Sequence, residues 1–163
     1  MRHILLVHSA AVKDEALRVC DRHPELNADR NIVEAGAMLH DIGIVKCDAA
    51  GIQCFGNEPY IKHGVLGAQM LDDIKSDTTV NPYPHETIEK LKRICARHTG
   101  TGLPGLEPET IEEIIVCYAD KFFSKTKLDK KKTPEQAVNS LRKFGEEGVN
   151  IFNNWHEKLK VEN

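Results

Sequence analysis

The chain has 163 residues, enough for one domain, and we expect a single domain over residues 1–163. Its 22 basic and 25 acidic residues give a formal net charge of -3, which argues against a strong general attraction to nucleic acid or anionic lipid. No apolar stretch of 18 residues occurs, and the five cysteines form no Cys-x-x-Cys pair. We therefore expect a soluble, cytoplasmic protein that spans no membrane and has no disulfide framework.

The first segment has the spacing of an amphipathic helix. Apolar side chains and one histidine recur every three or four positions, at Leu5, His8, Val12, Ala16 and Val19. The helix should end near residue 22, because His23 precedes a proline. This spacing places His8 on the inward face.

The second helix should be the central buried one, since Ile32 to Leu39 are apolar on nearly every side. Asn31 and Glu34 have the spacing of a capping box. His40 and Asp41 fall at the end of this helix, before Gly43, which can act as a C-cap. A loop from about residue 43 to 59 follows, and its length suggests a functional role such as a lid.

Two of the next three helices each carry a histidine on an apolar face, and the third carries an aspartate. His63 shares a face with Gly67, which leaves room for close helix approach, and His98 follows Ile88, Leu91 and Cys95 in helical spacing. A further helix after Pro108 should place Asp120 on one face with Val116 and Phe123. Two more helices are expected at about 134–147 and 149–160, so the sequence predicts an all-α fold.

Imidazoles and carboxylates on apolar helix faces lose hydration and need partners. Taken singly, each histidine is more simply explained as a hydrogen-bonded core residue. Together, the six groups would leave many buried polar atoms unsatisfied, which favours a metal site formed by His8, His40, Asp41, His63, His98 and Asp120. Four of these ligands would hold one ion; all six, with a bridging carboxylate, would hold two ions about 3.5–4 Å apart.

His40-Asp-Ile-Gly43 resembles the HDIG signature of the HD superfamily of metal-dependent phosphohydrolases. Four further segments resemble the other motifs of that family in chain order: His8-Ser9, His63 with Gly67, Arg97-His98 and Ala119-Asp120-Lys121. The resemblance covers about residues 8–125 and implies a single HD-type helical bundle with one or two divalent ions, of Mn, Fe, Ni, Co or Zn. It also implies that His8, His40, Asp41 and Asp120 form the basic ligand set, to which His63 and His98 are added in binuclear members.

Some positions depart from the pattern of the family members that cleave cyclic dinucleotides. Leu103 replaces their tyrosine in Gly100-Thr-Gly-Leu-Pro104, and Arg97 stands where they often have a second histidine. We therefore do not assign cyclic-dinucleotide cleavage.

The candidates for phosphate binding are Lys46, Arg97, Lys121 and Lys125, with Arg97 the first choice because it precedes His98. As catalytic residues we expect Asp41, Arg97 and Lys121. The remaining lysines of the basic run at residues 125–132 are more simply explained as solvated surface charges.

The leading expectation is a phosphohydrolase acting on a nucleotide or another small phosphate ester by metal-activated hydroxide. The expected partner is a small phosphorylated substrate, with nucleic acid unlikely and no membrane involved. One alternative is a di-iron oxygenase, because some HD relatives use the same ligand order to activate oxygen. A second alternative is a sensor or adaptor that keeps the metal without turnover.

Overall fold

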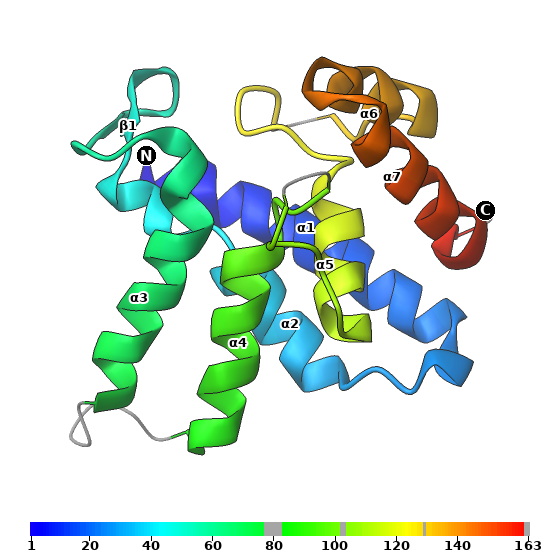
Figure 1. Ribbon diagram of the computed structural model, residues 1–163, viewed down its shortest axis with the longest axis horizontal. Helices are drawn as coiled ribbons and strands as arrows, with labels where there is room; N and C mark the ends of the chain where they lie inside the picture. The colour runs from blue at the N-terminus through cyan, green and yellow to red at the C-terminus, as the bar shows by residue number, and fades with distance from the viewer. Residues whose placement is uncertain (77–82, 102–103, 129, 162–163) are drawn as a thin grey trace.

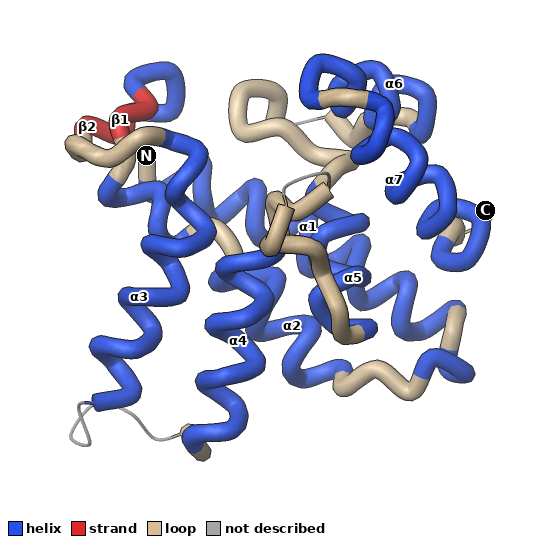
Figure 2. Tube along the Cα trace, viewed as in Figure 1, coloured by secondary structure: helices blue, strands red, loops and turns tan. Residues whose placement is uncertain are grey.

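The computed structural model describes residues 1–76, 83–101, 104–128 and 130–161. In this part of the chain nearly all regular structure is helical, as Figure 2 shows, and the all-α prediction is confirmed. The helices are α1 (Arg2–Arg22), α2 (Arg30–Leu39), α3 (His63–Ser76), α4 (His85–Arg97), α5 (Ile111–Asp120), α6 (Pro134–Leu141) and α7 (Glu146–Leu159).

The helices form one packed body with α1 running through its middle (Figure 1). The α1 helix packs against both α2 and α5, while α3 and α4 lie side by side. The C-terminal pair, α6 and α7, packs against the rest chiefly through contacts of α7 with α5. Of the helices in the described ranges, none is long and apolar enough to cross a membrane.

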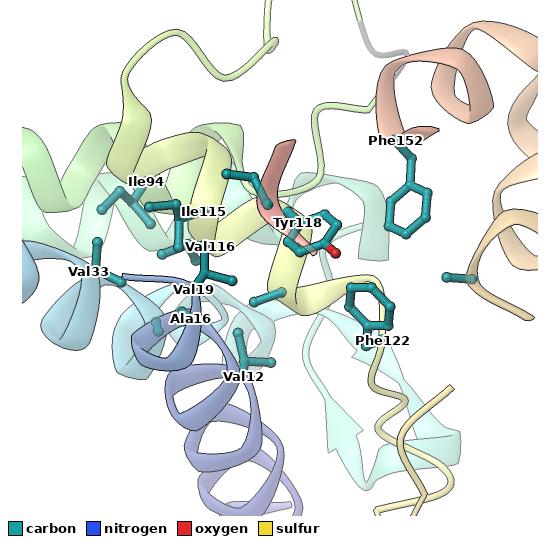
Figure 3. Packing of buried hydrophobic residues seen from close by; sticks show 14 of the residues in the cluster. Val12, Ala16, Val19, Val33, Ile94, Ile115, Val116, Tyr118, Phe122 and Phe152 are labelled. Atoms are coloured by element: carbon teal, nitrogen blue, oxygen red, sulfur yellow. The ribbon is translucent and has the colours of Figure 1, made fainter. Parts of the chain in front are cut away.

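The main core lies where α1, α2, α5 and α7 meet (Figure 3). Val12, Val33 and Ile115 are fully buried there. On the C-terminal side, the Tyr118 ring stacks on Phe152 with centroids 5.5 Å apart, and the Tyr118 hydroxyl lies 2.8 Å from Nδ1 of His156. These contacts anchor α7 on α5 and so fix the end of α5, where Asp120 lies.

Side-chain caps define where several helices begin. Asp29 accepts hydrogen bonds from the backbone of Asn31 and Ile32, so α2 begins at Arg30 and Asn31 lies inside the helix. The expected capping box of Asn31 with Glu34 is therefore not the start of α2. Reciprocal capping boxes do start two later helices, formed by Thr110 with Glu113 in α5 and by Thr133 with Gln136 in α6.

The segment expected to be a loop after α2 is more ordered than predicted. It contains the 3₁₀ turn η2 (Ile42–Lys46) and a small antiparallel sheet of β1 (Asp48–Ala49) and β2 (Cys54–Phe55). Gly43 lies inside η2 instead of acting as a left-handed cap. A Cβ atom there would lie 2.1 Å from the carbonyl oxygen of His63 and 2.3 Å from the backbone nitrogen of Gly67. The glycine is therefore required for close packing of η2 on α3.

The C-terminal region also differs in detail from the expected two helices. After α6 the chain forms the 3₁₀ turn η5 (Arg142–Phe144), and Gly145, with a φ of 111°, separates it from α7. Leu103, which distinguishes this sequence from the cyclic-dinucleotide pattern, lies outside the described residues.

Candidate metal centre and its cleft

The fold brings all six predicted ligands together, although they come from five segments of the chain. One side chain comes from the middle of a helix, His8 in α1, and the others lie at or next to helix ends: His40, Asp41, His63, His98 and Asp120. The helix ends converge because α3 and α4 pack together and η2 packs closely on the start of α3. Helical spacing predicted the inward faces of four of these residues, His40 and Asp41 were expected at a helix end, and tertiary packing brings all six together.

Asp41 is the central residue of the cluster, and its two oxygens face different histidines. Oδ2 lies 3.2 Å from Nε2 of His8 and 3.2 Å from Nε2 of His40. Oδ1 lies 3.4 Å from Nε2 of both His63 and His98. Each oxygen thus completes a group of three ligand atoms that can surround one cation. A single carboxylate that joins two such groups is suited to bridging two ions.

Asp120 closes the side of the cluster that contains His8. Its Oδ1 atom lies 3.1 Å from Nε2 of His8 and 3.6 Å from Nε2 of His40. The imidazoles of the cluster are nearly inaccessible to solvent, whereas the Asp120 side chain keeps 15% of its surface exposed. Asp120 therefore lies between the buried ligands and the open side of the site.

Backbone carbonyl groups hold three of the four imidazoles in one orientation. The Nδ1 atoms of His40, His63 and His98 lie 2.6–2.7 Å from the carbonyl oxygens of Ala37, Tyr60 and Cys95. A proton on Nδ1 that is donated to the carbonyl leaves the Nε2 lone pair free, and each Nε2 points into the cluster. A hydrogen bond from the other ring nitrogen to a backbone carbonyl is typical of histidines that bind metals.

The surroundings shift the pKa values of the cluster in a direction that suits a cation site. Burial opposes ionisation of Asp41, but His40 and Lys125 outweigh it and hold the pKa of this carboxyl well below its usual range. Burial lowers the pKa of His98 to about 3 and also lowers that of His63. Both imidazoles are therefore neutral near pH 7, the form that coordinates a metal.

His40 is the exception. Burial alone would lower its pKa, but the Asp41 and Asp120 carboxylates raise it to about 9. A proton on His40 thus partly balances the two buried acids.

The donor set fits one or two divalent cations. Both carboxylate oxygens of Asp41 are buried, and Nζ of Lys125 lies 2.7 Å from one of them, Oδ2. The other oxygen, Oδ1, faces the neutral imidazoles of His63 and His98, an arrangement that can bind a cation. Imidazole nitrogen and carboxylate oxygen together suit the borderline ions Mn, Fe, Co, Ni and Zn.

Two lysines from the end of α5 and the loop after it border the cluster. Nζ of Lys125 lies 2.7 Å from Oδ2 of Asp41. Nζ of Lys121 lies 3.3 Å from Oδ2 of Asp120 and donates to the carbonyl oxygen of His98 at 2.8 Å. Lys121 therefore ties the end of α5 to the end of α4, and Lys125 brings a positive charge to the ligand shared by both groups.

Two other candidates for phosphate binding lie away from the cluster. Arg97 donates to the carbonyl oxygen of Glu107, and its guanidinium lies 3.1 Å from a carboxylate oxygen of Glu109. Lys46 lies exposed on η2. Neither residue lines the cleft that leads to the cluster. Arg97 adjoins His98 in the sequence, but its side chain points toward Glu109, which precedes α5, and Glu113 in the first turn of α5.

A cleft of about 730 Å³ opens beside the cluster and is reached by His63, Asp120, Lys121 and Lys125. One wall of the cleft is formed by α6 and η5, and another by the β1–β2 hairpin and the turn before α3. Four further residues that line it were not expected at the site from the sequence: Tyr60, Lys132, Lys143 and Phe144. Lys132 belongs to the basic run at residues 125–132, but the sequence does not show which lysines of that run face the cleft.

The fold and the site together define a helical domain of the metal-dependent hydrolase type. The sequence profile of the HD domain matches residues 5–125, and the chain belongs to this family. No solved structure matches the chain with significance.

Two curated relatives are tRNA (cytidine(56)-2'-O)-methyltransferases. The protein from Thermoplasma volcanium is 32% identical over 153 aligned residues, which cover 86% of this chain and 37% of the relative. The protein from Picrophilus torridus is 31% identical over 137 residues, which cover 77% of this chain and 33% of the relative. The chain thus spans about a third of the length of the curated relatives it matches.

These relatives correct one expectation. A small phosphorylated substrate, with nucleic acid unlikely, was expected, whereas the relatives are named for an activity on tRNA. That prediction of the partner was wrong. It rested on the net charge of -3, which averages over the whole surface. The cleft beside the cluster is locally basic, since its charged lining includes four lysines: Lys121, Lys125, Lys132 and Lys143.

Proposed function

We propose that the chain is a metal-dependent phosphohydrolase that hydrolyses a phosphate ester at the end of an RNA. The observation that carries the proposal is the position of Asp41, whose two oxygens each face a pair of imidazoles and which lies 2.7 Å from Lys125, one of the lysines that line the cleft. Cations at both the attacking and the leaving oxygen favour hydrolysis of a phosphate ester, and ions held by the two ligand groups around Asp41 would supply them.

In this proposal six side chains would hold two divalent ions. His8, His40, Asp41 and Asp120 would form one ligand set, and His63 and His98 would form the other together with Asp41. The identity of the ions lies among Mn, Fe, Ni, Co and Zn. When bound, such ions lower the pKa of a coordinated water and stabilise negative charge on phosphoryl oxygens.

The lysines have separate roles in the proposal. Lys125, with Nζ 2.7 Å from Asp41 and its side chain at the cleft, is placed to contact a phosphoryl oxygen. Burial opposes its charge, but Asp41 and Asp120 outweigh burial and raise its pKa above the usual value. Lys125 therefore acts as a fixed positive charge and not as a proton donor. Lys121 is a positioning residue, because it holds Asp120 and the end of α4.

The reaction is a hydrolysis and needs no further reactant. Oxygen of water forms a bond to phosphorus, the bond from phosphorus to the ester oxygen breaks, and a proton of the water passes to the leaving oxygen. Negative charge builds on the phosphoryl oxygens as this occurs, which is where the charge of Lys125 acts.

Two observations favour an RNA end as the substrate. The imidazoles of the cluster are at most 4% exposed, so the scissile phosphate must enter deeply, which a chain end can do more easily than the middle of a duplex. The relatives, in turn, are named for an activity on tRNA, although the methyl transfer in their name is not carried over to a chain that covers a third of their length. We expect the activity in the cytoplasm, where the five free cysteines would stay reduced.

The oxygenase alternative uses the same ligand order and the sensor alternative the same metal site. The lysines favour the hydrolase over both. Oxygen is uncharged and gains little from Lys125, whereas a phosphate dianion gains much from it. A sensor does not need a cleft that leads from solvent to the ligands.

The test is release of inorganic phosphate from single-stranded RNA pentamers that carry a 5' or a 3' phosphate. The metal-loaded chain should release phosphate equally well with and without oxygen. Asp41→Ala should be inactive, and His85→Ala should keep full activity because His85 is an exposed histidine at the start of α4. Absence of phosphate release with every ion, or a strict need for oxygen, would refute the proposal.

A further inference from the structure

Part of the cleft wall comes from residues outside the metal cluster, in the loop before α6 and in η5. This part, which we call the outer cleft, is bordered by Lys132, Lys143 and Phe144. A phosphate group alone would occupy only the inner end of a cleft of about 730 Å³, which is large enough for a ligand of drug size, or about one to two nucleotides. The outer cleft therefore has room for the part of the substrate that follows the phosphate.

The two lysines of the outer cleft differ from their basic neighbours. Lys131 pairs with Glu15 at 2.7 Å, and Arg142 pairs with Glu146 at 3.7 Å. In the described part of the chain no carboxylate lies within ion-pair distance of Lys132 or Lys143. The basic residues next to them in the sequence, Lys131 and Arg142, are thus paired with carboxylates, while the two lysines that face the cleft have no such partner among the described residues.

The fold holds Lys132 in place despite this lack of an acidic partner. Its backbone nitrogen donates to the carbonyl oxygen of Phe122 at 2.8 Å, and its Nζ donates to the carbonyl oxygen of Lys121 at 3.3 Å. Burial lowers the pKa of Lys132, and Lys121, Lys143 and Lys125 add to that effect while Asp120 opposes it. Positive charge is therefore crowded here, and a bound anion would relieve the repulsion.

The aromatic side chain of the outer cleft is exposed where a core residue would be covered. Phe144 is 66% exposed. Nζ of Lys143 lies 4.8 Å from the centre of the Phe144 ring, which places a cation next to a flat apolar surface. Aromatic faces next to cations along one groove are the usual means of binding single-stranded nucleic acid, since every base has a face that can stack.

We propose that the outer cleft binds the nucleotides next to the terminal phosphate of a single-stranded RNA, with Lys132 and Lys143 contacting backbone phosphates and Phe144 stacking on a base. This inference rests on the proposed function and adds the substrate class, an oligonucleotide instead of a mononucleotide. Base stacking on a phenylalanine tolerates any base, so the outer cleft should select for a chain of nucleotides and not for its sequence.

The test is a binding titration of the full metal-loaded chain with an RNA pentamer that carries hydroxyl groups at both ends and 2-aminopurine at an internal position. Because this probe resembles the product, its binding does not depend on turnover. Phe144→Ala should weaken binding about fivefold or more. Lys143→Ala should weaken binding and reduce the slope of log affinity against log salt by about 0.7, the value for one phosphate contact on a single strand.

Two matched variants serve as controls. Phe55→Ala removes an aromatic ring that is 78% exposed but lies outside the cleft, and Lys127→Ala removes an exposed lysine of the same basic run. Both should bind the pentamer as the wild type does. The inference is overturned if Phe144→Ala and Lys143→Ala bind like these controls, or if the pentamer does not bind.

The test also separates this inference from the proposed function. If the wild type releases phosphate from phosphorylated pentamers but Phe144→Ala and Lys143→Ala bind the pentamer as well as the controls do, the inference about the outer cleft is wrong. The hydrolase proposal then still stands. Binding that depends on Lys143 and Phe144, without phosphate release under any condition, would support the outer cleft and refute the hydrolase.

Discussion

Nζ of Lys125 lies 2.7 Å from Oδ2 of Asp41, the carboxylate that faces all four imidazoles of the cluster. A divalent ion and this ammonium group would both be drawn to the same oxygen. The contact therefore couples Lys125 to metal binding at Asp41. The role of Lys125 can be tested by metal affinity as well as by activity.

We expect Lys125→Gln to separate metal binding from turnover. Without the lysine, a cation meets less competition at Asp41, so metal affinity should rise several-fold while phosphate release falls about 100-fold or more, since one charge on the phosphoryl group is lost. Calorimetric titration with Mn and a phosphate-release assay measure the two quantities. Lys127→Gln, an exposed lysine outside the cleft, should change neither. Metal affinity that drops in Lys125→Gln would contradict this role.

The two groups of ligands should be separable by substitution. We expect His63→Ala to lower the metal content from about two ions per chain to about one, because it removes a ligand from only one of the groups around Asp41. Elemental analysis after dialysis measures the content, and His85→Ala is the control. If both ions remain in His63→Ala, the centre is not binuclear in the proposed way.

Metal binding should release protons in a way that depends on His40. Its raised pKa of about 9 means that the imidazole is protonated at pH 7.5 in the metal-free chain, whereas the low pKa values of His63 and His98 leave them neutral. An ion must displace the proton on His40, so we expect release of about one proton at pH 7.5.

The sign of the pH effect follows from the same shift. Affinity for the ion should increase as the pH rises toward about 9, where His40 loses its proton unaided, and should then level off. Calorimetry in buffers of different ionisation enthalpy gives both the proton count and the affinity. Affinity that is constant between pH 6.5 and pH 9 would be inconsistent with a protonated His40.

The packing of η2 on α3 should be intolerant of a single methyl group. In Gly43→Ala the new Cβ atom would meet backbone atoms of His63 and Gly67, which cannot rotate away, so we expect a loss of about 2 kcal/mol or more in the free energy of unfolding. Gly51→Ala is a matched control, because nothing lies within 4 Å of its added Cβ atom. Urea denaturation measures both. Equal stability of the two variants would show that η2 can move away from α3.

Helical periodicity predicted a large part of the site, although its residues lie far apart in the sequence. His8, His63, His98 and Asp120 each stand in a run of apolar residues with helical spacing, which fixed their inward faces before any fold was known. His40 and Asp41 were expected at a helix end, and α2 does end at Leu39. The roles of these residues as ligands, and the single domain over residues 1–163, stay predictions.

Features that depend on contacts between distant segments were not predictable in this way. The direction of the Arg97 side chain is decided by Glu109 and Glu113, which the packing of α5 on α4 brings beside it. The same holds for Lys143 and Phe144, which face the cleft because α7 packs on α5 and carries η5 with it. The β1–β2 hairpin was missed because its strands have only two residues each and show no alternation.

The central claim is that six distant side chains share a metal centre organised by Asp41. Elemental analysis of the purified wild type and of Asp41→Ala, each incubated with excess Mn and then dialysed, tests it most directly. We predict about two ions per chain in the wild type and essentially none in Asp41→Ala, because that change removes a ligand from both groups. A wild type without bound metal, or an Asp41→Ala variant with the same metal content as the wild type, would contradict the claim.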